Sequence, residues 1–162
     1  MWPDSFVNDY SPILLAEDDE DDIFMMRRAL RQAGIANPLQ IVRNGQEAIW
    51  YLKGEGMYAD RRTYPWPCLL MLDLRMPLMD GFDVLAWLQR RRRPKDLMVV
   101  ILSSSEHETD VLRVSELGAD AYYAKPQAFD DLVALGSQLR DRLDKLPAVP
   151  PWLAPPGQEA RL

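Results

Sequence analysis

The chain has 162 residues and a formal net charge of −6. This length is enough for one domain with a buried core, and the negative charge argues against nucleic acid as the main partner, because the phosphate backbone binds a basic face. The single cysteine and single histidine exclude an internal disulfide and metal sites built from several such residues. No apolar stretch approaches the ~20 residues of a membrane span, and the first residues lack the features of a signal peptide. We therefore expect a cytoplasmic protein with no membrane partner.

Short apolar runs alternate along the chain with segments whose apolar residues recur at helical spacing. The apolar runs predict strands at residues 13–16, 39–42, 68–72, 97–102 and 121–124. The other segments predict helices at residues 21–33, around 48–52, and at 82–92, 108–117 and 129–145. Strict alternation of strands and helices predicts an α/β fold in which helices cover both faces of a parallel sheet.

Two stretches depart from this alternation. Residues 53–67 form a long predicted loop that is rich in Gly, Tyr, Arg and Pro. Frequent prolines from Pro147 onward rule out a helix, so we expect an extended or disordered tail there. The chain is thus divided into an N-terminal arm (1–10), a folded domain (11–146) and a Pro-rich C-terminal tail (147–162).

The polar residues that can carry chemistry directly follow or end the predicted strands. Glu17 and Asp18 follow the first strand, Asp73 the third, Ser103 the fourth and Lys125 the fifth. The carboxyl ends of parallel strands meet at one edge, which is where ligands bind in open α/β sheets. Three neighbouring carboxylates repel one another, and a set of oxygen ligands of this kind suits Mg²⁺. With a lysine and a hydroxyl nearby, the set predicts transfer of a phosphoryl group onto Asp73.

Four segments in this order resemble the receiver domain of response regulators in two-component signalling. The segments are Leu14-Leu15-Ala16-Glu17-Asp18-Asp19, Leu72-Asp73-Leu74-Arg75-Met76-Pro77-Leu78-Met79-Asp80-Gly81, Ile101-Leu102-Ser103-Ser104 and Ala124-Lys125-Pro126. The resemblance covers about residues 11–146. It implies a (βα)5 doubly wound five-stranded parallel sheet, the flavodoxin-like receiver fold, with strand order 2-1-3-4-5.

The resemblance also implies how the acidic residues act. Asp73 falls on the phosphoacceptor, which takes a phosphoryl group from a phosphohistidine of a partner histidine kinase in a reaction that requires Mg²⁺. Asp18 falls on a direct metal ligand, and Glu17 on an acid that acts through water. Asp73 itself and the backbone carbonyl of Arg75 complete the metal site. The strand pattern favours Glu17 and Asp18 as the acidic pair, and the neighbouring Asp19 stays open as an alternative member of it.

Three further residues fall on functional positions of the family. Ser103 falls on the switch hydroxyl, and Lys125 on the lysine that contacts the phosphoryl group. Tyr122 falls on the aromatic switch, whose rotamer changes as the hydroxyl moves. The Lys125–Pro126 peptide bond is expected to be cis, as in the family.

A second resemblance concerns a subgroup of this family. The long loop before the third strand, with Tyr58, Tyr64 and Trp66, is similar to that of stand-alone receivers that serve bacterial phytochrome-type histidine kinases, and so is a tail without an output domain. We therefore expect such a kinase as a partner. By analogy we also expect a homodimer formed through the fourth helix, fifth strand and fifth helix, and a tail that docks on the domain or across the dimer.

Other interpretations of the same residues stay open. An aspartyl-nucleophile phosphohydrolase would place a second acid two residues after the nucleophile, where this chain has Arg75. A pseudo-receiver that only binds a partner would not need the acidic set or Lys125. Taken alone, the run from Ser103 to Ser105 indicates a loop or a helix cap, and Asp80 before Gly81 indicates a turn and a helix cap.

Overall fold

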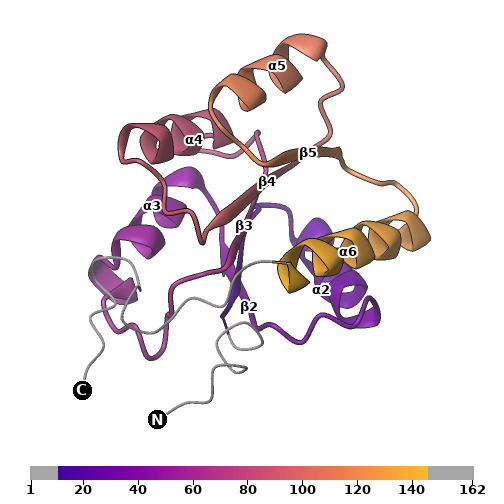
Figure 1. Cartoon of the computed structure of the whole chain (residues 1–162), viewed down its shortest axis with the longest axis horizontal. Coiled ribbons are helices and arrows are strands. Elements are labelled where there is room, and N and C mark those ends of the chain that lie inside the picture. The colour runs from indigo at the N-terminus through magenta and orange to yellow at the C-terminus, as the bar shows by residue number, and fades with distance from the viewer. Residues whose placement is uncertain (1–10, 146–162) are drawn as a thin grey trace.

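A computed structural model describes residues 11–145 of the chain (Figure 1). Within this range five parallel strands form one sheet in the order β2-β1-β3-β4-β5. The predicted fold class and strand order are therefore confirmed. The strands are β1 (Ile13–Ala16), β2 (Leu39–Val42), β3 (Leu69–Leu72), β4 (Met98–Ser103) and β5 (Ala121–Ala124).

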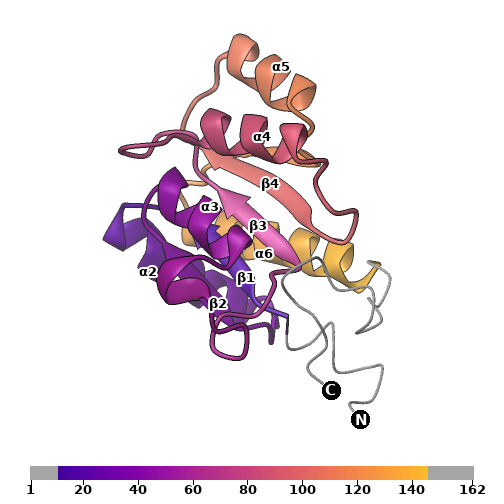
Figure 2. The ribbon, with the colours of Figure 1, turned by 90° about the vertical axis from the view of Figure 1, so that its left-hand side faces the viewer.

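Helices cover both faces of this sheet (Figures 1 and 2). Those on one face are α2 (Glu20–Gln32) and α6 (Phe129–Asp144), and those on the other are α3 (Gly45–Lys53), α4 (Gly81–Arg90) and α5 (Glu108–Glu116). Successive strand residues point to opposite faces, so Leu14 packs under α3 and α4, whereas Leu15 packs under α2 and α6. The central strands β1, β3 and β4 are buried along their whole length, as the apolar runs predict.

The segment predicted as a long loop is locally ordered by an arginine. Its only regular element within the described residues is a short 3-10 helix, Gly56–Tyr58. The Arg61 guanidinium donates hydrogen bonds to the carbonyl oxygens of Tyr51 (2.7 Å) and Leu52 (2.8 Å) in the last turn of α3. The last carbonyls of a helix carry a partial negative charge, so a cation there stabilises the helix end. The guanidinium carbon of Arg61 also lies 5.9 Å from the ring centroids of Tyr51 and Trp66.

The expectation of a cis Lys125–Pro126 bond is wrong for this structure. No cis peptide bond occurs between residues 11 and 145, and trans is the form that most X-Pro bonds prefer. The N-terminal arm and the Pro-rich tail, with its predicted docking, lie outside the described residues. Among the helices of the described range, none combines the length and the apolar character needed to span a bilayer.

Candidate functional site

The polar residues predicted at strand ends do meet at one edge of the sheet. Glu17, Asp73 and Lys125 each follow the last residue of their strand, and Ser103 is the last residue of β4. Glu17 and Asp73 are only 3% and 6% exposed. Buried carboxylates are costly unless they are paired or hydrogen-bonded, so the side chains around them decide what this edge can do.

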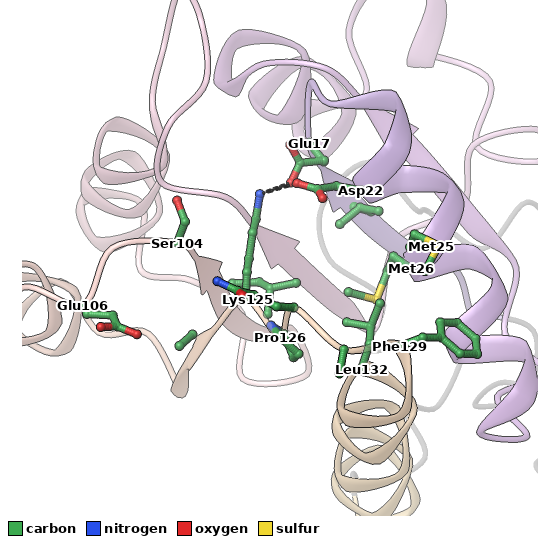
Figure 3. A pocket seen from close by; sticks show the side chains of 15 residues that line it. Glu17, Asp22, Met25, Met26, Ser104, Glu106, Lys125, Pro126, Phe129 and Leu132 are labelled. Atoms are coloured by element: carbon green, nitrogen blue, oxygen red, sulfur yellow. Dashed lines mark hydrogen bonds and ion pairs between the residues drawn. The ribbon is translucent and has the colours of Figure 1, made fainter.

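The ammonium group of Lys125 lies among three carboxylates. Its Nζ donates to Glu17 Oε2 at 2.7 Å, to Asp22 Oδ2 at 2.9 Å and to Asp73 Oδ2 at 3.2 Å. Figure 3 shows the lysine side chain extending from the end of β5 toward Glu17 and Asp22. An ammonium has three N–H donors, and each of them has a carboxylate partner here.

Asp22 is a member of this site that the sequence did not point out. The side chain of Asp19 caps α2 by accepting a hydrogen bond from the backbone N–H of Asp22 at 3.0 Å. This cap fixes the first turn of α2 so that Asp22 reaches Lys125, 103 residues away in the sequence. In the sequence, acidic residues follow β1 and lead directly into α2. This is the one signal that could have suggested a residue of the first turn of α2, such as Asp22, as part of the site.

Three carboxylates lie close enough together to share a cation. Glu17, Asp18 and Asp73 each offer an oxygen, and these oxygens lie within 4.8 Å of one another. Asp18 is exposed, whereas Asp19 is occupied as the helix cap. Among the described residues, Asp18 therefore lies in the carboxylate cluster and Asp19 does not.

Burial perturbs the charges of this cluster. It raises the pKa of Glu17 to about 7, a rise that the hydrogen bond from Lys125 only partly opposes. It also raises the pKa of Asp73, against the attraction of Lys125. Burial alone would lower the pKa of Lys125, but its hydrogen bonds to Glu17 and Asp22 outweigh this effect and raise it. Counting Asp18, four carboxylates lie around one ammonium, so the edge lacks positive charge.

This arrangement fits a small divalent cation. Mg²⁺ prefers oxygen ligands at about 2.1 Å, so two of its ligand oxygens lie at most about 4.2 Å apart. The 4.8 Å spread of the three carboxylate oxygens is close to this limit, and small side-chain rotations would bring them within it. The excess of negative charge supplies the electrostatic reason for a cation at this place.

The loop after β3 holds Asp73 through close backbone contacts. The backbone N–H of Arg75 donates to Asp73 Oδ1 at 3.3 Å, and the N–H of Gly81 donates to the carbonyl of Leu74 at 3.0 Å. A Cβ atom on Gly81 would lie 2.4 Å from the carbonyl oxygen of Asp73, so only glycine allows this approach. Asp80 caps α4 in a reciprocal capping box with Asp83, which agrees with its predicted role as a helix cap.

Ser103 and Tyr122 belong to a second network beside the acidic cluster. The Ser103 hydroxyl is fully buried and accepts a hydrogen bond from the backbone N–H of Ser105 at 3.1 Å. The Tyr122 hydroxyl donates to the carbonyl of Ser105. Among the described residues, no hydrogen bond links the Ser103 hydroxyl to the carboxylates, although the Ser103 carbonyl accepts a hydrogen bond from the backbone N–H of Lys125 at 2.8 Å. Ser105 is a further residue that the sequence did not single out.

A cavity of about 500 Å³ opens beside Lys125 (Figure 3). Its apolar side is formed by α2 and the start of α6, with Met25, Met26 and Leu132. Its polar side includes Lys125 and Glu106. The ammonium can therefore be approached from this side without displacing the core.

Comparison with known proteins identifies the family to which this arrangement belongs. Residues 13–136 match the response regulator receiver domain. The chain belongs to this family. The prediction from the sequence that the chain contains a receiver domain of two-component signalling is confirmed, and the fold agrees with that of its structural neighbours.

Three relatives show how close the match is. Response regulator Rcp1 of Synechocystis sp. is 35% identical over 120 residues, which cover 74% of this chain and 80% of Rcp1. The crystal structure of a Mn²⁺-bound form of Rcp1 has a TM-score of 0.72 at 30% identity, and the match covers 86% of this chain and 99% of that one. The regulator RPA3017 in red light signalling of R. palustris has a TM-score of 0.77 at 29% identity, covering 86% and 98%. The phosphorylated cyanobacterial phytochrome response regulator RcpA has a TM-score of 0.74 at 30% identity, covering 87% and 99%.

Proposed function

We propose that this receiver domain accepts a phosphoryl group on Asp73 from a phosphohistidine of a partner histidine kinase. The observation that carries the proposal is the buried Asp73 carboxylate, 3.2 Å from the Lys125 ammonium and grouped with Glu17 and Asp18. In this role the protein is a phosphoacceptor with at most slow self-dephosphorylation, and it passes the signal on through protein contacts.

The chemistry needs a nucleophile and charge stabilisation. A carboxylate oxygen of Asp73 attacks the phosphorus of the phosphohistidine; a P–O bond forms while the P–N bond breaks, and the departing imidazole nitrogen takes up a proton. Lys125 contacts a phosphoryl oxygen and offsets its charge. Ser103 offers its hydroxyl to a second oxygen, and Tyr122 follows the movement of Ser103 as the aromatic switch.

The acidic cluster is proposed to hold Mg²⁺ during this transfer. Asp18, Asp73 and the backbone carbonyl of Arg75 are the proposed direct ligands, and Glu17 acts through a water. When bound, the ion neutralises charge on the acids and on the phosphoryl oxygens. The excess of carboxylates over ammonium at this edge supports its presence, and the Mn²⁺-bound form of Rcp1 gives a precedent in a relative.

The partners are proposed from the relatives. RcpA is a cyanobacterial phytochrome response regulator and RPA3017 acts in red light signalling, so we propose a bacterial phytochrome-type histidine kinase as the phosphoryl donor. A cytoplasmic homodimer formed through α5, β5 and α6 remains part of this proposal. So does the division into an arm, a receiver domain and a tail that docks on the domain or across the dimer.

The direct test is labelling by a small phosphoramidate. The full chain is incubated with phosphoramidate and Mg²⁺, and phosphorylated protein is separated by phosphate-affinity electrophoresis. We expect labelling that EDTA abolishes and that Asp73→Asn and Asp18→Asn remove. Asp19→Asn is the matched control, because asparagine caps helices as well as aspartate does and residue 19 lies outside the carboxylate cluster. Labelling that persists in Asp73→Asn, or sustained turnover of a phosphomonoester, would replace the proposal with another function.

A further inference from the structure

The three carboxylate partners of Lys125 are not equivalent. Glu17 and Asp73 follow strands and are buried, whereas Asp22 lies in the first turn of α2 and its side chain is half-exposed. The Lys125 ammonium nevertheless lies closer to the carboxylate of Asp22, at 2.9 Å, than to that of Asp73, at 3.2 Å. The lysine is therefore shared between the carboxylate proposed to be phosphorylated and an acid of a neighbouring helix.

The bond between Asp22 and Lys125 is built into the start of α2. One oxygen of Glu17 accepts a hydrogen bond from the backbone N–H of Asp19 at 3.1 Å, and the other oxygen accepts from Lys125. Asp19 in turn caps α2 by accepting a hydrogen bond from the backbone N–H of Asp22. Together with the bond from Lys125 to Asp22, these bonds close a ring that holds the Asp22 carboxylate at the ammonium although it faces solvent.

We propose that Asp22 is a positioning residue that competes with the phosphoryl group for the ammonium of Lys125. In the resting protein Asp22 occupies one of the three N–H donors and holds the ammonium toward α2. When Asp73 carries a phosphoryl group, the ammonium turns to the phosphoryl oxygens and releases Asp22. This inference rests on the proposed phosphorylation of Asp73, but the resting bond between Asp22 and Lys125 can be tested without it.

The competition follows from the number of donors and the charge of the acceptors. A phosphoryl oxygen can take over the donor that points to Asp73, but a second contact needs one of the two other donors of Lys125. A phosphoryl group carries roughly two negative charges and accepts strong hydrogen bonds, so this second contact is favourable. Glu17 is buried and cannot replace its bond by water, so Asp22 gives way. By linkage, Asp22 and the phosphoryl group weaken each other's hold on the lysine to the same extent.

Asp22 also acts through its charge alone, and this effect has to be separated from that of the bond. Any carboxylate near the site repels an incoming anion. Asp21 is the matched control, because it lies in the same turn of α2, is exposed and, among the described residues, is not one of the acids paired with Lys125. Glu20 is less suitable, because it pairs with Arg43.

The first test is the affinity of the full chain for beryllium fluoride, which mimics a phosphoryl group on a carboxylate. Binding is measured by fluorine NMR at saturating Mg²⁺ for the wild type, Asp22→Ala and Asp21→Ala. We expect the Kd of Asp22→Ala to be about fivefold lower than that of Asp21→Ala, because breaking an exposed ion pair costs up to about this factor. The initial rate of labelling by phosphoramidate should be higher in Asp22→Ala than in Asp21→Ala.

The second test measures the resting bond directly. NMR of the lysine side chains gives the rate at which the protons of the Lys125 ammonium exchange with water. We expect this exchange to be roughly fivefold faster in Asp22→Ala than in the wild type and in Asp21→Ala. Asp22→Asn keeps an oxygen that accepts from the ammonium but lacks the charge, so it should lie between the wild type and Asp22→Ala in both tests. If Asp22→Ala does not fold, Asp22→Asn decides the question.

The outcomes distinguish this inference from the proposed function. A Kd for beryllium fluoride in Asp22→Ala that equals or exceeds that of Asp21→Ala would overturn the competition. Equal exchange of the Lys125 ammonium in the wild type and Asp22→Ala would overturn it as well. If the wild type neither binds beryllium fluoride nor is labelled on Asp73, the proposed function fails and the competition fails with it, whereas the ammonium exchange still decides whether Asp22 holds Lys125.

Discussion

Replacing Gly81 with alanine should slow phosphorylation of Asp73 without contacting the carboxylate. The new Cβ would lie 2.4 Å from the carbonyl oxygen of Asp73 and 2.9 Å from Leu74 Cα. Both contacts are with backbone atoms, so no side-chain rotation relieves them. To reach a separation of 3.0 Å, the Asp73 backbone or the start of α4 must move by about 0.6 Å, the difference between 3.0 and 2.4 Å.

The magnitude follows from two opposing effects. Alanine favours a helix over glycine by up to about 1 kcal/mol, whereas overpacking costs about 1–3 kcal/mol. We therefore expect Gly81→Ala to lower the free energy of unfolding by about 1–2 kcal/mol. A misplacement of reacting atoms by 1 Å can cost about 100-fold in rate, so a shift of about half that size should slow labelling by phosphoramidate by about tenfold.

Gly136→Ala is the matched control for this prediction. Its Cβ would lie 2.9 Å from Ala33 Cβ, so it introduces a milder overlap between α6 and α2, away from the loop after β3. Thermal unfolding and initial labelling rates are measured for both variants at saturating Mg²⁺. Gly136→Ala should lose stability but keep its labelling rate. Equal labelling rates in Gly81→Ala and the wild type would refute the view that this glycine positions Asp73.

Three further predictions concern charge and protonation. Lys125→Met should lower the free energy of unfolding at pH 8 by about 3–5 kcal/mol, because it leaves buried carboxylates without their cation. Calorimetry with and without Mg²⁺ should show that the ion restores part of this stability. The pKa of Glu17 is raised to about 7, so its protonation stabilises the metal-free fold below about pH 4.5 and this contribution is lost as pH rises through 7. Protons should also compete with Mg²⁺, giving about tenfold weaker binding at pH 6 than at pH 8 by titration calorimetry; a pH-independent Kd would contradict this. Burial raises the pKa of Cys68 to about 12, so its thiol should react with a disulfide reagent at pH 8 at least about a hundredfold more slowly than in the urea-unfolded chain.

The sequence located the strands well because their apolar runs are short and clearly bounded. The runs at 13–16, 39–42 and 121–124 have the observed bounds, the run at 68–72 begins one residue early, and the run at 97–102 is displaced by one residue. Periodicity alone does not give the order of strands in a sheet, because it carries no information on which neighbours pair. The order came from the resemblance to receivers, and the pairing of β1 with both β2 and β3 agrees with it.

The site was predictable only where the topology alone brings residues together. Glu17, Asp73 and Lys125 follow parallel strands, so they must share an edge. Asp22 and Ser105 were missed because their roles depend on the direction of a helix turn and on the path of a loop. Asp22 reaches Lys125 only because Asp19 caps α2 at one particular residue, and Ser105 reaches Asp110 only because the chain turns back before α5. Neither condition leaves a periodic pattern in the sequence.

The two networks at this edge determine what a phosphoryl group would change first. Lys125 has no spare donor, because its three N–H groups already have Glu17, Asp22 and Asp73 as partners. A phosphoryl oxygen on Asp73 can take over the donor that points to Asp73 itself, whereas a second phosphoryl contact would have to displace Glu17 or Asp22. The Asp22 side chain is 49% exposed and can be solvated by water, whereas that of Glu17 is 4% exposed and cannot. If the phosphoryl group takes a second donor of Lys125, the bond to Asp22 should break before the bond to Glu17, and the N-terminus of α2 would then lose its tie to the sheet edge.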